Sequence, residues 1–338
     1  MADRTMRFGL FGSAPAPRES ADPASGFRDY VDMNVEAEAL GYHASFLVEH
    51  HFTGHGQVSA SLALQSWVAA HTTRLHIGTA VLVLPWHNPV LLAEQAATLG
   101  LMSGGRLDFG VGKGYRRNEF DGFCVPIDEA QARFEECLAV ILKCWTSEKP
   151  FSHAGAYWRF ADIVVEPPPA QRPHPPLWMA AGSEASIRRV AALNANLLLD
   201  QFATPDEIEA RIALYRGARE AQGHGFDPLS VAVARDVYVA TDAADLAAGR
   251  AAQARAHGQM VALSRHADGG HRSHILSYTD RPGGTQASGL FGLPDAVVRD
   301  LIALHDRGVR CVLVNGGRAQ RETLRRVALH VMPHFSIG

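Results

Sequence analysis

The order in which short apolar segments and longer helical segments alternate constrains the fold of this chain more than any other feature. Apolar runs of strand length are followed by segments with apolar residues at helical spacing. Parallel strands need crossover connections of this kind, so the pattern predicts an α/β fold with a parallel sheet. The expected strands are 6–12, 43–48, 75–84, 106–111, 177–181, 196–200, 230–240 and 309–315.

The expected helices alternate with these strands. They are 27–40, 60–70, 89–102, 128–145, 184–193, 205–222 and 318–331, and a hairpin excursion followed by a loop is expected over 146–176. Strands spread over all 338 residues favour a closed (β/α)8 TIM barrel, with 1–338 forming a single domain. A doubly wound open sheet is the competing α/β architecture.

The segment between the seventh and eighth expected strands is long for a compact domain. Its part 260–289 is rich in Gly, Ser, His and Arg and shows little periodicity. We expect an insertion that acts as a lid, because barrel active sites lie at the carboxyl ends of the strands, where this segment emerges. A solvated polar loop is the alternative. The candidate substrate contacts in the lid are His266, His271, Arg272 and His274.

Composition narrows the class of protein. The net charge of −3 gives no electrostatic reason to expect nucleic acid or an anionic membrane as a partner. No apolar run reaches the roughly 18–20 residues that a membrane span requires, and the first residues show no export signal, so we expect a cytoplasmic protein. The four cysteines form no CxxC pair and are expected to be reduced thiols.

The segment Glu49-His50-His51-Phe52 directly follows the second expected strand, on the catalytic face of a barrel. Adjacent histidines beside a carboxylate can exchange protons as acid or base, which makes His50, Glu49 and His51 the catalytic candidates. A hydrogen-bonded loop is the structural alternative. No metal site is expected, because the HExxH motif is absent and vicinal histidines rarely bind one ion.

The glycine-rich run 109–117 ends the fourth expected strand. Its alternate glycines, among them Gly112, allow a flat ligand to approach the backbone, and Lys113 with the two arginines after it supplies charge for a phosphate. Tyr115 stands where a dinucleotide fingerprint needs its third glycine, so this run is not such a fingerprint. A tight turn with solvated cations is the alternative.

A second candidate phosphate cradle joins the fifth expected strand to its helix. Ala181, Gly182, Ser183 and Ser186 offer backbone amides at a helix start together with serine hydroxyls, although an ordinary N-cap is the alternative.

Two further candidates are weaker on local grounds. Arg133 lies early in the long expected helix 128–145 and is by itself more typical of a solvated surface residue, while Ala80-Val81 within the third strand is more typical of core.

Taken together, these segments resemble the bacterial-luciferase-like flavin monooxygenase family. The resemblance rests on FLVEHHFTGHG (46–56), on 77–123, on ARFEECLAVILKCW (132–145) and on WMAAGSEAS (178–186). It is continuous to about residue 200 and returns at 292–294 and in the last strand.

The resemblance implies a barrel, reduced FMN as cofactor, and a monooxygenase reaction. In that reaction, the C4a-hydroperoxide that the flavin forms with O2 oxidises a small organic substrate. It also implies a separate NAD(P)H:flavin reductase and a homodimer formed through the helices after strands two and three. Phe11, Trp86 and Phe202 at the expected pocket mouth suggest a mainly apolar substrate whose identity the sequence does not give.

Carried onto this chain, the resemblance assigns roles to individual residues. His50 matches the catalytic histidine, supported by Glu49 and His51, and Ala80 and Val81 match the backbone against which the isoalloxazine ring packs. Gly112 stands where luciferase itself has a reactive cysteine, which argues against luciferase but not against the family. The cofactor-binding residues implied beside Ala80 and Val81 are Gly112, Lys113, Tyr115, Arg133, Ala181, Gly182, Ser183 and Ser186.

Three alternative functions stay open. A deazaflavin-dependent hydride-transfer enzyme on the same barrel is disfavoured by the EHHF segment, and a flavin-binding protein without turnover is disfavoured by His50. A metal-dependent barrel hydrolase would need carboxylates or histidines at several strand ends, and the sequence offers few beyond His50 and His51.

Overall fold

The computed structural model describes residues 4–15, 21–54, 58–264 and 288–336. Eight of its strands form a parallel barrel. They are β1 (Arg7–Gly12), β2 (Ala44–Leu47), β3 (His76–Thr79), β5 (Leu107–Gly112), β8 (Leu177–Ala180), β9 (Asn196–Leu199), β10 (Val231–Val239) and β12 (Cys311–Asn315).

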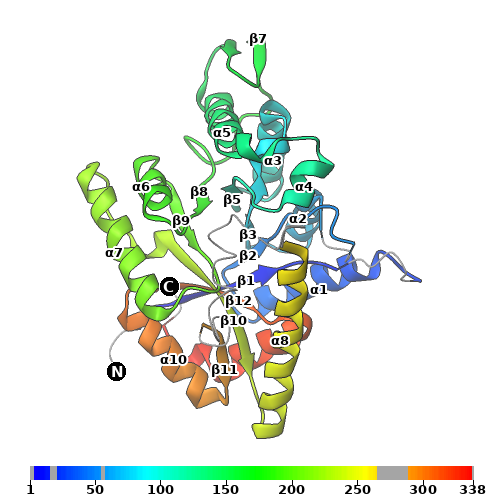
Figure 1. The fold of residues 1–338 in the computed structure, drawn as a ribbon, viewed down its shortest axis with the longest axis vertical. Coiled ribbons are helices and arrows are strands. Elements are labelled where there is room, and N and C mark those ends of the chain that lie inside the picture. Colours follow the sequence, from blue (N-terminus) through cyan, green and yellow to red (C-terminus); the bar gives the residue numbers. More distant parts are fainter. Residues whose placement is uncertain (1–3, 16–20, 55–57, 265–287, 337–338) are drawn as a thin grey trace. The chain divides into compact units, whose positions relative to one another are not determined.

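The barrel is closed. Along the sheet the strands follow the order β1-β2-β3-β5-β8-β9-β10-β12, and β12 pairs with β1 in parallel (Figure 1). The predicted (β/α)8 barrel is confirmed, and the open doubly wound sheet is wrong because β9 and β12 both pair with β10. Residues of β2 and β5 are buried throughout, as expected for parallel strands covered on both faces.

Helices separate successive barrel strands along the chain. They are α1 (Ser25–Ala39), α2 (Ser61–His71), α3 (Pro89–Met102), α4 (Arg117–Gly122), α5 (Ala130–Thr146), α6 (Glu184–Ala192), α7 (Pro205–Ala221), α8 (Ala243–Ser264), α10 (Pro294–Asp306) and α11 (Gln320–His330). Short 3-10 turns are η1 (Leu84–Trp86), η2 (Ile127–Glu129), η3 (Pro228–Ser230), η5 (Gly317–Ala319) and η6 (Met332–His334).

Local sequence signals explain where these helices begin. The Asn88 side chain caps α3 by accepting the N–H groups of Val90 and Leu91, and Pro89 occupies the first helical position. In α7, Thr204 forms a reciprocal capping box with Glu207.

The chain divides into two compact units. Unit 1 comprises Met1–Gly12, Glu36–Ala44 and Met179–Gly338, and unit 2 comprises Ser13–Val35 and Ser45–Trp178. Each unit is described by itself below, and the single domain over 1–338 stays a prediction.

In unit 2, the predicted continuous strand 75–84 is wrong. It breaks after β3, and the chain resumes as β4 (Leu82–Val83), which pairs with β5. The Ala80–Val81 peptide bond inside the break is cis. The Thr79 hydroxyl holds the end of β3 against β5, because it donates to the Gly110 carbonyl oxygen at 2.7 Å and accepts the Gly110 N–H at 3.0 Å.

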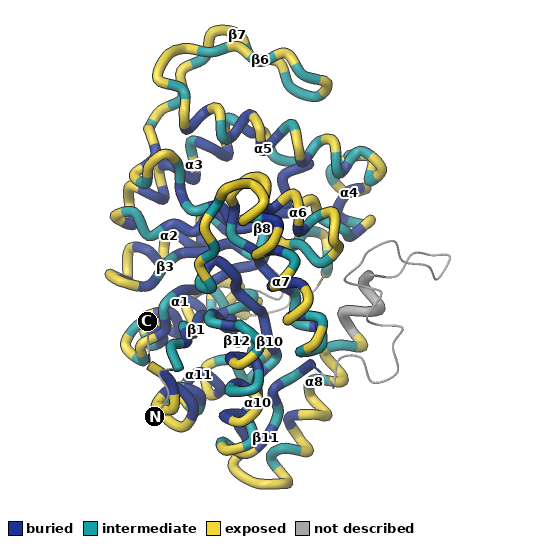
Figure 2. Tube along the Cα trace, turned by 90° about the vertical axis from the view of Figure 1, so that its left-hand side faces the viewer, coloured by how far each residue is buried: buried dark blue, intermediate teal, exposed yellow. Residues whose placement is uncertain are grey.

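The predicted hairpin excursion in unit 2 is confirmed as the antiparallel pair β6 (Phe151–Ala154) and β7 (Arg159–Ile163), next to α5 in Figures 1 and 2. The Glu136 carboxylate of α5 accepts the N–H groups of Ala156, Tyr157 and Trp158 and contacts the His153 ring. Burial acts to raise the pKa of Glu136, but these hydrogen bonds hold it below its ordinary value. A single carboxylate therefore fixes the hairpin tip.

In unit 1, β10 and β12 are mostly buried and form the core, shown in dark blue in Figure 2. The second half of β10 also pairs with β11 (Leu290–Gly292), a strand that the sequence analysis did not predict. In the expected lid, α8 continues to Ser264, and His266, His271, Arg272 and His274 lie outside the described residues.

Across the described residues, no helix combines the length and the apolar character that crossing a bilayer requires.

The Arg106 guanidinium ties together the ends of two helices in unit 2. Its Nε donates to the Ser103 carbonyl oxygen at 2.7 Å, and Nη1 donates to the Leu75 carbonyl oxygen at 2.7 Å. The Nη2 atom donates to the carbonyl oxygens of Ala69 and Thr72, both at 3.0 Å. These acceptors lie at or beyond the C-termini of α2 and α3, where helical carbonyl groups lack partners.

We therefore expect Arg106→Met to lower the free energy of unfolding by about 2–4 kcal/mol, because it leaves several carbonyl groups without their charged donor. Urea unfolding followed by circular dichroism measures the change. The matched control is Arg117→Met, since Arg117 is exposed and its ion pair is with the equally exposed Asp121; it should cost less than about 0.5 kcal/mol. Equal losses in both variants would contradict this role of Arg106.

Candidate active site

The Glu49 carboxylate, in unit 2 directly after β2, accepts four N–H groups. Its Oε1 contacts His51 Nε2 at 2.8 Å, His87 Nε2 at 2.8 Å and Trp86 Nε1 at 3.1 Å. Its Oε2 accepts the Val83 backbone N–H at 2.8 Å. The side chain is only 1% exposed, so these four donors replace water around a buried charge.

These contacts decide the charge of Glu49. Burial acts to raise its pKa, but the hydrogen bonds from His51 and His87 outweigh burial and lower the pKa from 4.5 to about 2. Glu49 is therefore an anion at neutral pH. It cannot donate a proton, and its role is to hold the groups around it.

His50 faces a different carboxylate from its neighbour His51. His50 Nδ1 lies 3.0 Å from Glu119 Oε1, which also accepts the His51 backbone N–H at 3.0 Å and lies 3.9 Å from Arg116 Nη1. Burial lowers the pKa of His50; Glu119 opposes this shift, and the Arg116 charge adds to it. With a pKa below 6.5, His50 is neutral at pH 7.

Sequence reasoning missed Glu119 and His87. Glu119 belongs to α4, a six-residue helix without a side-chain cap, which is too short to show helical periodicity. His87 follows η1, in the short connection between the expected strand 75–84 and the expected helix 89–102, where no motif marks it. The sequence could have indicated Glu119 only through its position, since it is a carboxylate two residues after the glycine-rich run 109–117.

Aromatic rings pack around the His51 ring. Ring centroids of Phe123, Trp86 and Phe52 lie 4.7, 5.8 and 5.9 Å from it. Trp86 also stacks on Phe123 at 5.1 Å with an interplanar angle of 24°. The histidine–carboxylate cluster therefore has an apolar side.

The β3–β4 break lies beside this cluster, because Val83 in β4 donates to Glu49. Ala80 and Val81 are half-buried, and the Ala80 N–H donates to the Leu47 carbonyl oxygen of β2 at 2.8 Å. Val81 occupies the space that a Cβ on Gly112 would need. The structure thus brings Ala80, Val81 and Gly112 together into a small, apolar stretch of backbone.

The predicted phosphate-side cations of unit 2 have different surroundings. Lys113 is exposed and makes no ion pair with another described residue. Arg133 Nε pairs with Glu129 at 2.8 Å, and its guanidinium lies over the Tyr157 ring at 4.3 Å. Arg133 is therefore held by its own helix and by the hairpin. Tyr115 is half-buried.

The predicted turn after β8 belongs to unit 1. Ser183 caps α6 and forms a capping box with Ser186, the two hydroxyl oxygens being 2.9 Å apart. Ser183 is exposed, while Ala181, Gly182 and Ser186 are half-buried. The ordinary N-cap is thus what these serines form, and their assignment to the cofactor stays a prediction.

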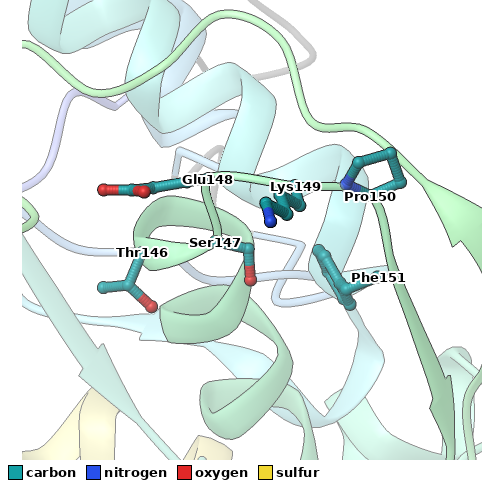
Figure 3. Close-up of a pocket in the computed structure, with 6 residues that line it drawn as sticks. All are labelled: Thr146, Ser147, Glu148, Lys149, Pro150 and Phe151. Carbon is teal, nitrogen blue, oxygen red and sulfur yellow. The ribbon is translucent and has the colours of Figure 1, made fainter.

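Two observations concern other kinds of site. Among the described residues, no group of three or more His, Cys, Asp or Glu side chains is arranged to hold a metal ion. A surface pocket of about 440 Å³ follows α5, and Figure 3 shows its lining by Thr146, Ser147, Glu148, Lys149, Pro150 and Phe151. None of these residues belongs to the predicted site, and we assign this pocket no function.

The fold and the cluster together define a TIM-barrel protein with a histidine–carboxylate cluster after a barrel strand. The family model for luciferase-like monooxygenases matches residues 6–311. The chain therefore belongs to the luciferase-like monooxygenase family, as the sequence resemblance predicted.

This chain covers about two thirds of the length of the relatives described here. An uncharacterized protein, y4vJ, of Sinorhizobium fredii is 32% identical over 71% of this chain and 69% of its own length. A luciferase-like monooxygenase of Escherichia coli is 29% identical over 64% of this chain and 62% of its own length. The oxygenase component of a flavin-dependent trigonelline monooxygenase of Acinetobacter baylyi is 26% identical over 71% of this chain and 67% of its own length.

Solved structures share the complete fold. The monooxygenase RslO1 from Streptomyces bottropensis has a TM-score of 0.85 and 25% identity, covering 98% of this chain and 100% of that one. The oxygenating constituent of 3,6-diketocamphane monooxygenase from Pseudomonas putida, in complex with FMN, has a TM-score of 0.78 at 20% identity, with 98% and 99% covered. An F420-dependent secondary alcohol dehydrogenase has a TM-score of 0.79 at 16% identity, covering 98% of this chain and 99% of that one. The last two likenesses show the fold alone.

We expect Glu49→Gln to destabilise the protein by about 2–4 kcal/mol at pH 7, from the depressed pKa of this carboxylate. A carboxylate whose folded pKa is lowered stabilises the protein fully above its unfolded pKa of 4.5. This stabilisation is lost as the pH falls through about 2. The difference between wild type and variant should therefore shrink over this window.

Urea midpoints measured at a series of pH values test this expectation. The matched control is Glu148→Gln, since Glu148 is exposed, and this variant should follow the wild type at every pH. A Glu49→Gln difference that stays constant down to the lowest pH would contradict an anionic, hydrogen-bonded Glu49.

Proposed function

We propose that this protein is a monooxygenase that uses reduced FMN and O2 to oxidise a small, mainly apolar organic substrate. The observation that carries the proposal is the hydrogen bond from the Val83 N–H to the Glu49 carboxylate. It holds the His50–His51 cluster next to the small-residue backbone at the β3–β4 break. Membership of the luciferase-like family and the flavin-dependent oxygenase component among the relatives support the same reaction class.

The residues at the break fit a flat cofactor. Ala80 and Val81 present a half-buried apolar surface, and Gly112 has no Cβ to compete with Val81 for space. Lys113, an exposed cation close behind Gly112, would hold the phosphate. Reduced FMN, when bound, supplies the electrons that activate O2. The assignments of Tyr115, Arg133, Ala181 and the α6 turn to this cofactor remain part of the proposal.

His50 is the residue that would accept a proton during the reaction. Glu119 Oε1 accepts the His51 N–H and faces His50 Nδ1, so an N–H on Nδ1 is the matching role. Nε2 of His50 is then the ring nitrogen that accepts a proton, and the lowered pKa keeps it free to do so at pH 7. Glu49 holds His51 and the break in place rather than exchanging a proton itself. The Trp86–Phe123 stack would exclude water and favour an apolar substrate.

A deazaflavin-dependent hydride transfer is the second candidate, and a flavin-binding protein without turnover is the third. The likeness to an F420-dependent alcohol dehydrogenase shares only the fold, so it does not favour that cofactor. The intact His50–Glu119 pair favours turnover over passive binding.

The proposal extends to partners and location. A separate NAD(P)H:flavin reductase would supply reduced FMN, as the words "oxygenase component" in the name of one relative suggest. A homodimer would cover exposed apolar side chains of α2 and α3, and the cytoplasm is the proposed location. These side chains are Trp67, Leu91, Leu101 and Met102.

Reduced FMN should bind at the β3–β4 break. We expect Gly112→Val to weaken its binding by at least about tenfold, because the new side chain displaces Val81. Anaerobic titration followed by tryptophan fluorescence measures the affinity. Gly217→Ala, at a helical position with open space, is the control and should bind like the wild type.

Equal affinity of Gly112→Val and wild type would move the cofactor site away from the break. Preference for reduced deazaflavin, without any reaction with O2, would favour the hydride-transfer alternative. No binding of any flavin would refute the proposed function.

His50 should control how the bound flavin reacts with oxygen. When O2 is admitted to the reduced complex, we expect the oxidised-flavin spectrum to return roughly tenfold faster in His50→Ala than in wild type. Stopped-flow absorbance measures this rate, and the affinity for reduced FMN serves as the control because it should stay unchanged. Identical reoxidation rates would remove His50 from the chemistry.

A further inference from the structure

Three neighbouring barrel strands of unit 1 carry polar and aromatic side chains at their carboxyl ends. Asp236 of β10 is the register partner of Asn315, the last residue of β12. Phe202 follows β9, which pairs with the other edge of β10. Because ligands of such barrels bind at the carboxyl ends of the strands, these side chains lie where a substrate subsite is expected.

The helix α8, which lies beside β10 in Figure 1, presents a polar face to these strand ends. Between positions 243 and 258, its less exposed residues are Asp245, Leu246, Gly249, Gln253 and His257. A helix that only covers a core normally presents an apolar stripe. In α8, Gln253 instead donates to Asp236, and the His257 ring lies 6.0 Å from the Phe202 ring.

The Asp236 side chain is half-buried and is held by two amide groups. Asn315 Nδ2 donates to Oδ1 at 2.7 Å, and Gln253 Nε2 donates to Oδ2 at 3.1 Å. Among the described residues, each carboxyl oxygen accepts one of these bonds, although a carboxylate oxygen can accept two. Each amide nitrogen also carries a second N–H. The cluster can therefore accept one hydrogen bond from a ligand and donate another to it.

The surroundings disfavour ligand charge of either sign. Burial raises the pKa of Asp236, against the amide hydrogen bonds and the Arg235 charge, so negative charge is already costly there. Burial also lowers the pKa of His257 and outweighs the attraction of the nearby Asp236, so positive charge is disfavoured as well. A neutral polar group is the best match to this cluster.

We propose that Asp236, Asn315 and Gln253 form a subsite that binds a neutral hydroxyl group carried on an apolar body. The hydroxyl hydrogen is donated to an Asp236 carboxyl oxygen, and the hydroxyl oxygen accepts the second N–H of an amide. The rings of Phe202 and His257 contact the apolar body. A hydroxyl group satisfies both kinds of partner, whereas an ether or a ketone only accepts. The inference rests on the proposed function in one respect, namely that this hydroxyl belongs to the substrate of the monooxygenase.

The subsite can be tested on the complete, flavin-free protein with two probes, benzyl alcohol and benzyl methyl ether. Both have a phenyl ring and one oxygen, but only the alcohol has an O–H to donate. We expect the alcohol to bind at least about fivefold more tightly. Titration followed by NMR of isotope-labelled glutamine side chains measures both affinities. The Gln253 signal, identified by its loss in Gln253→Glu, should shift with each probe and so locates the binding.

Asp236→Leu separates a binding role from a structural one. We expect this variant to bind the ether as the wild type does, while its affinity for the alcohol falls to that for the ether. A merely structural role of Asp236 would lower both affinities together, and that result would overturn the proposal. The matched control is Asp295→Leu, because Asp295 is exposed on α10; both affinities should stay unchanged.

Equal affinity of the wild type for both probes, no binding of either, or a Gln253 signal that stays fixed during binding would overturn the proposal. Tighter binding of benzylamine than of benzyl alcohol would replace it with a cation site. If Asp236→Leu fails to fold, the comparison of the probes on the wild type decides the question. Because these titrations contain no flavin, failure of the protein to bind FMN would leave their result intact.

Discussion

A charged carboxylate inside a protein needs hydrogen-bond donors around it, and Glu49 collects four of them from three segments of unit 2. An uncompensated anion in this position would cost several kcal/mol, so the donors cannot move away independently. This requirement fixes the chain after β2, the end of β4 and the turn η1 against one another. The cis peptide bond at the β3–β4 break and the Trp86 ring beside His51 both lie next to residues that Glu49 holds.

The same constraint separates the roles of two adjacent histidines. His51 turns to Glu49, while His50 turns to Glu119, where burial and the Arg116 charge lower the pKa of His50. Neighbours in sequence thus receive different environments from two carboxylates, which is a common way to divide acid and base tasks within one site. In the proposed monooxygenase, His50 moves a proton, and the Glu49 cluster holds the surrounding segments in place.

The sequence predicted most of the fold, and its errors have physical causes. The alternation of strands and helices gave the barrel, because each buried parallel strand is a continuous apolar run. The same continuity hid the break at Ala80–Val81, since apolar character does not change where the backbone turns. The helix α4 and the strand β11 were missed because a few residues show no measurable period. Arg133 matched a family position, yet the structure shows its guanidinium against Glu129 and Tyr157.

By itself, the sequence determined the barrel and the family and singled out Glu49-His50-His51 as the candidate catalytic segment, since local residue order and spacing carry these signals. Only the tertiary structure decided which carboxylate each histidine faces, that Glu49 is an anchor, and that His87 and Glu119 belong to the cluster. The contacts of Glu119 and His87 join residues dozens of positions apart. Their partners are selected by the way barrel strands and loops pack, and no local pattern records that choice.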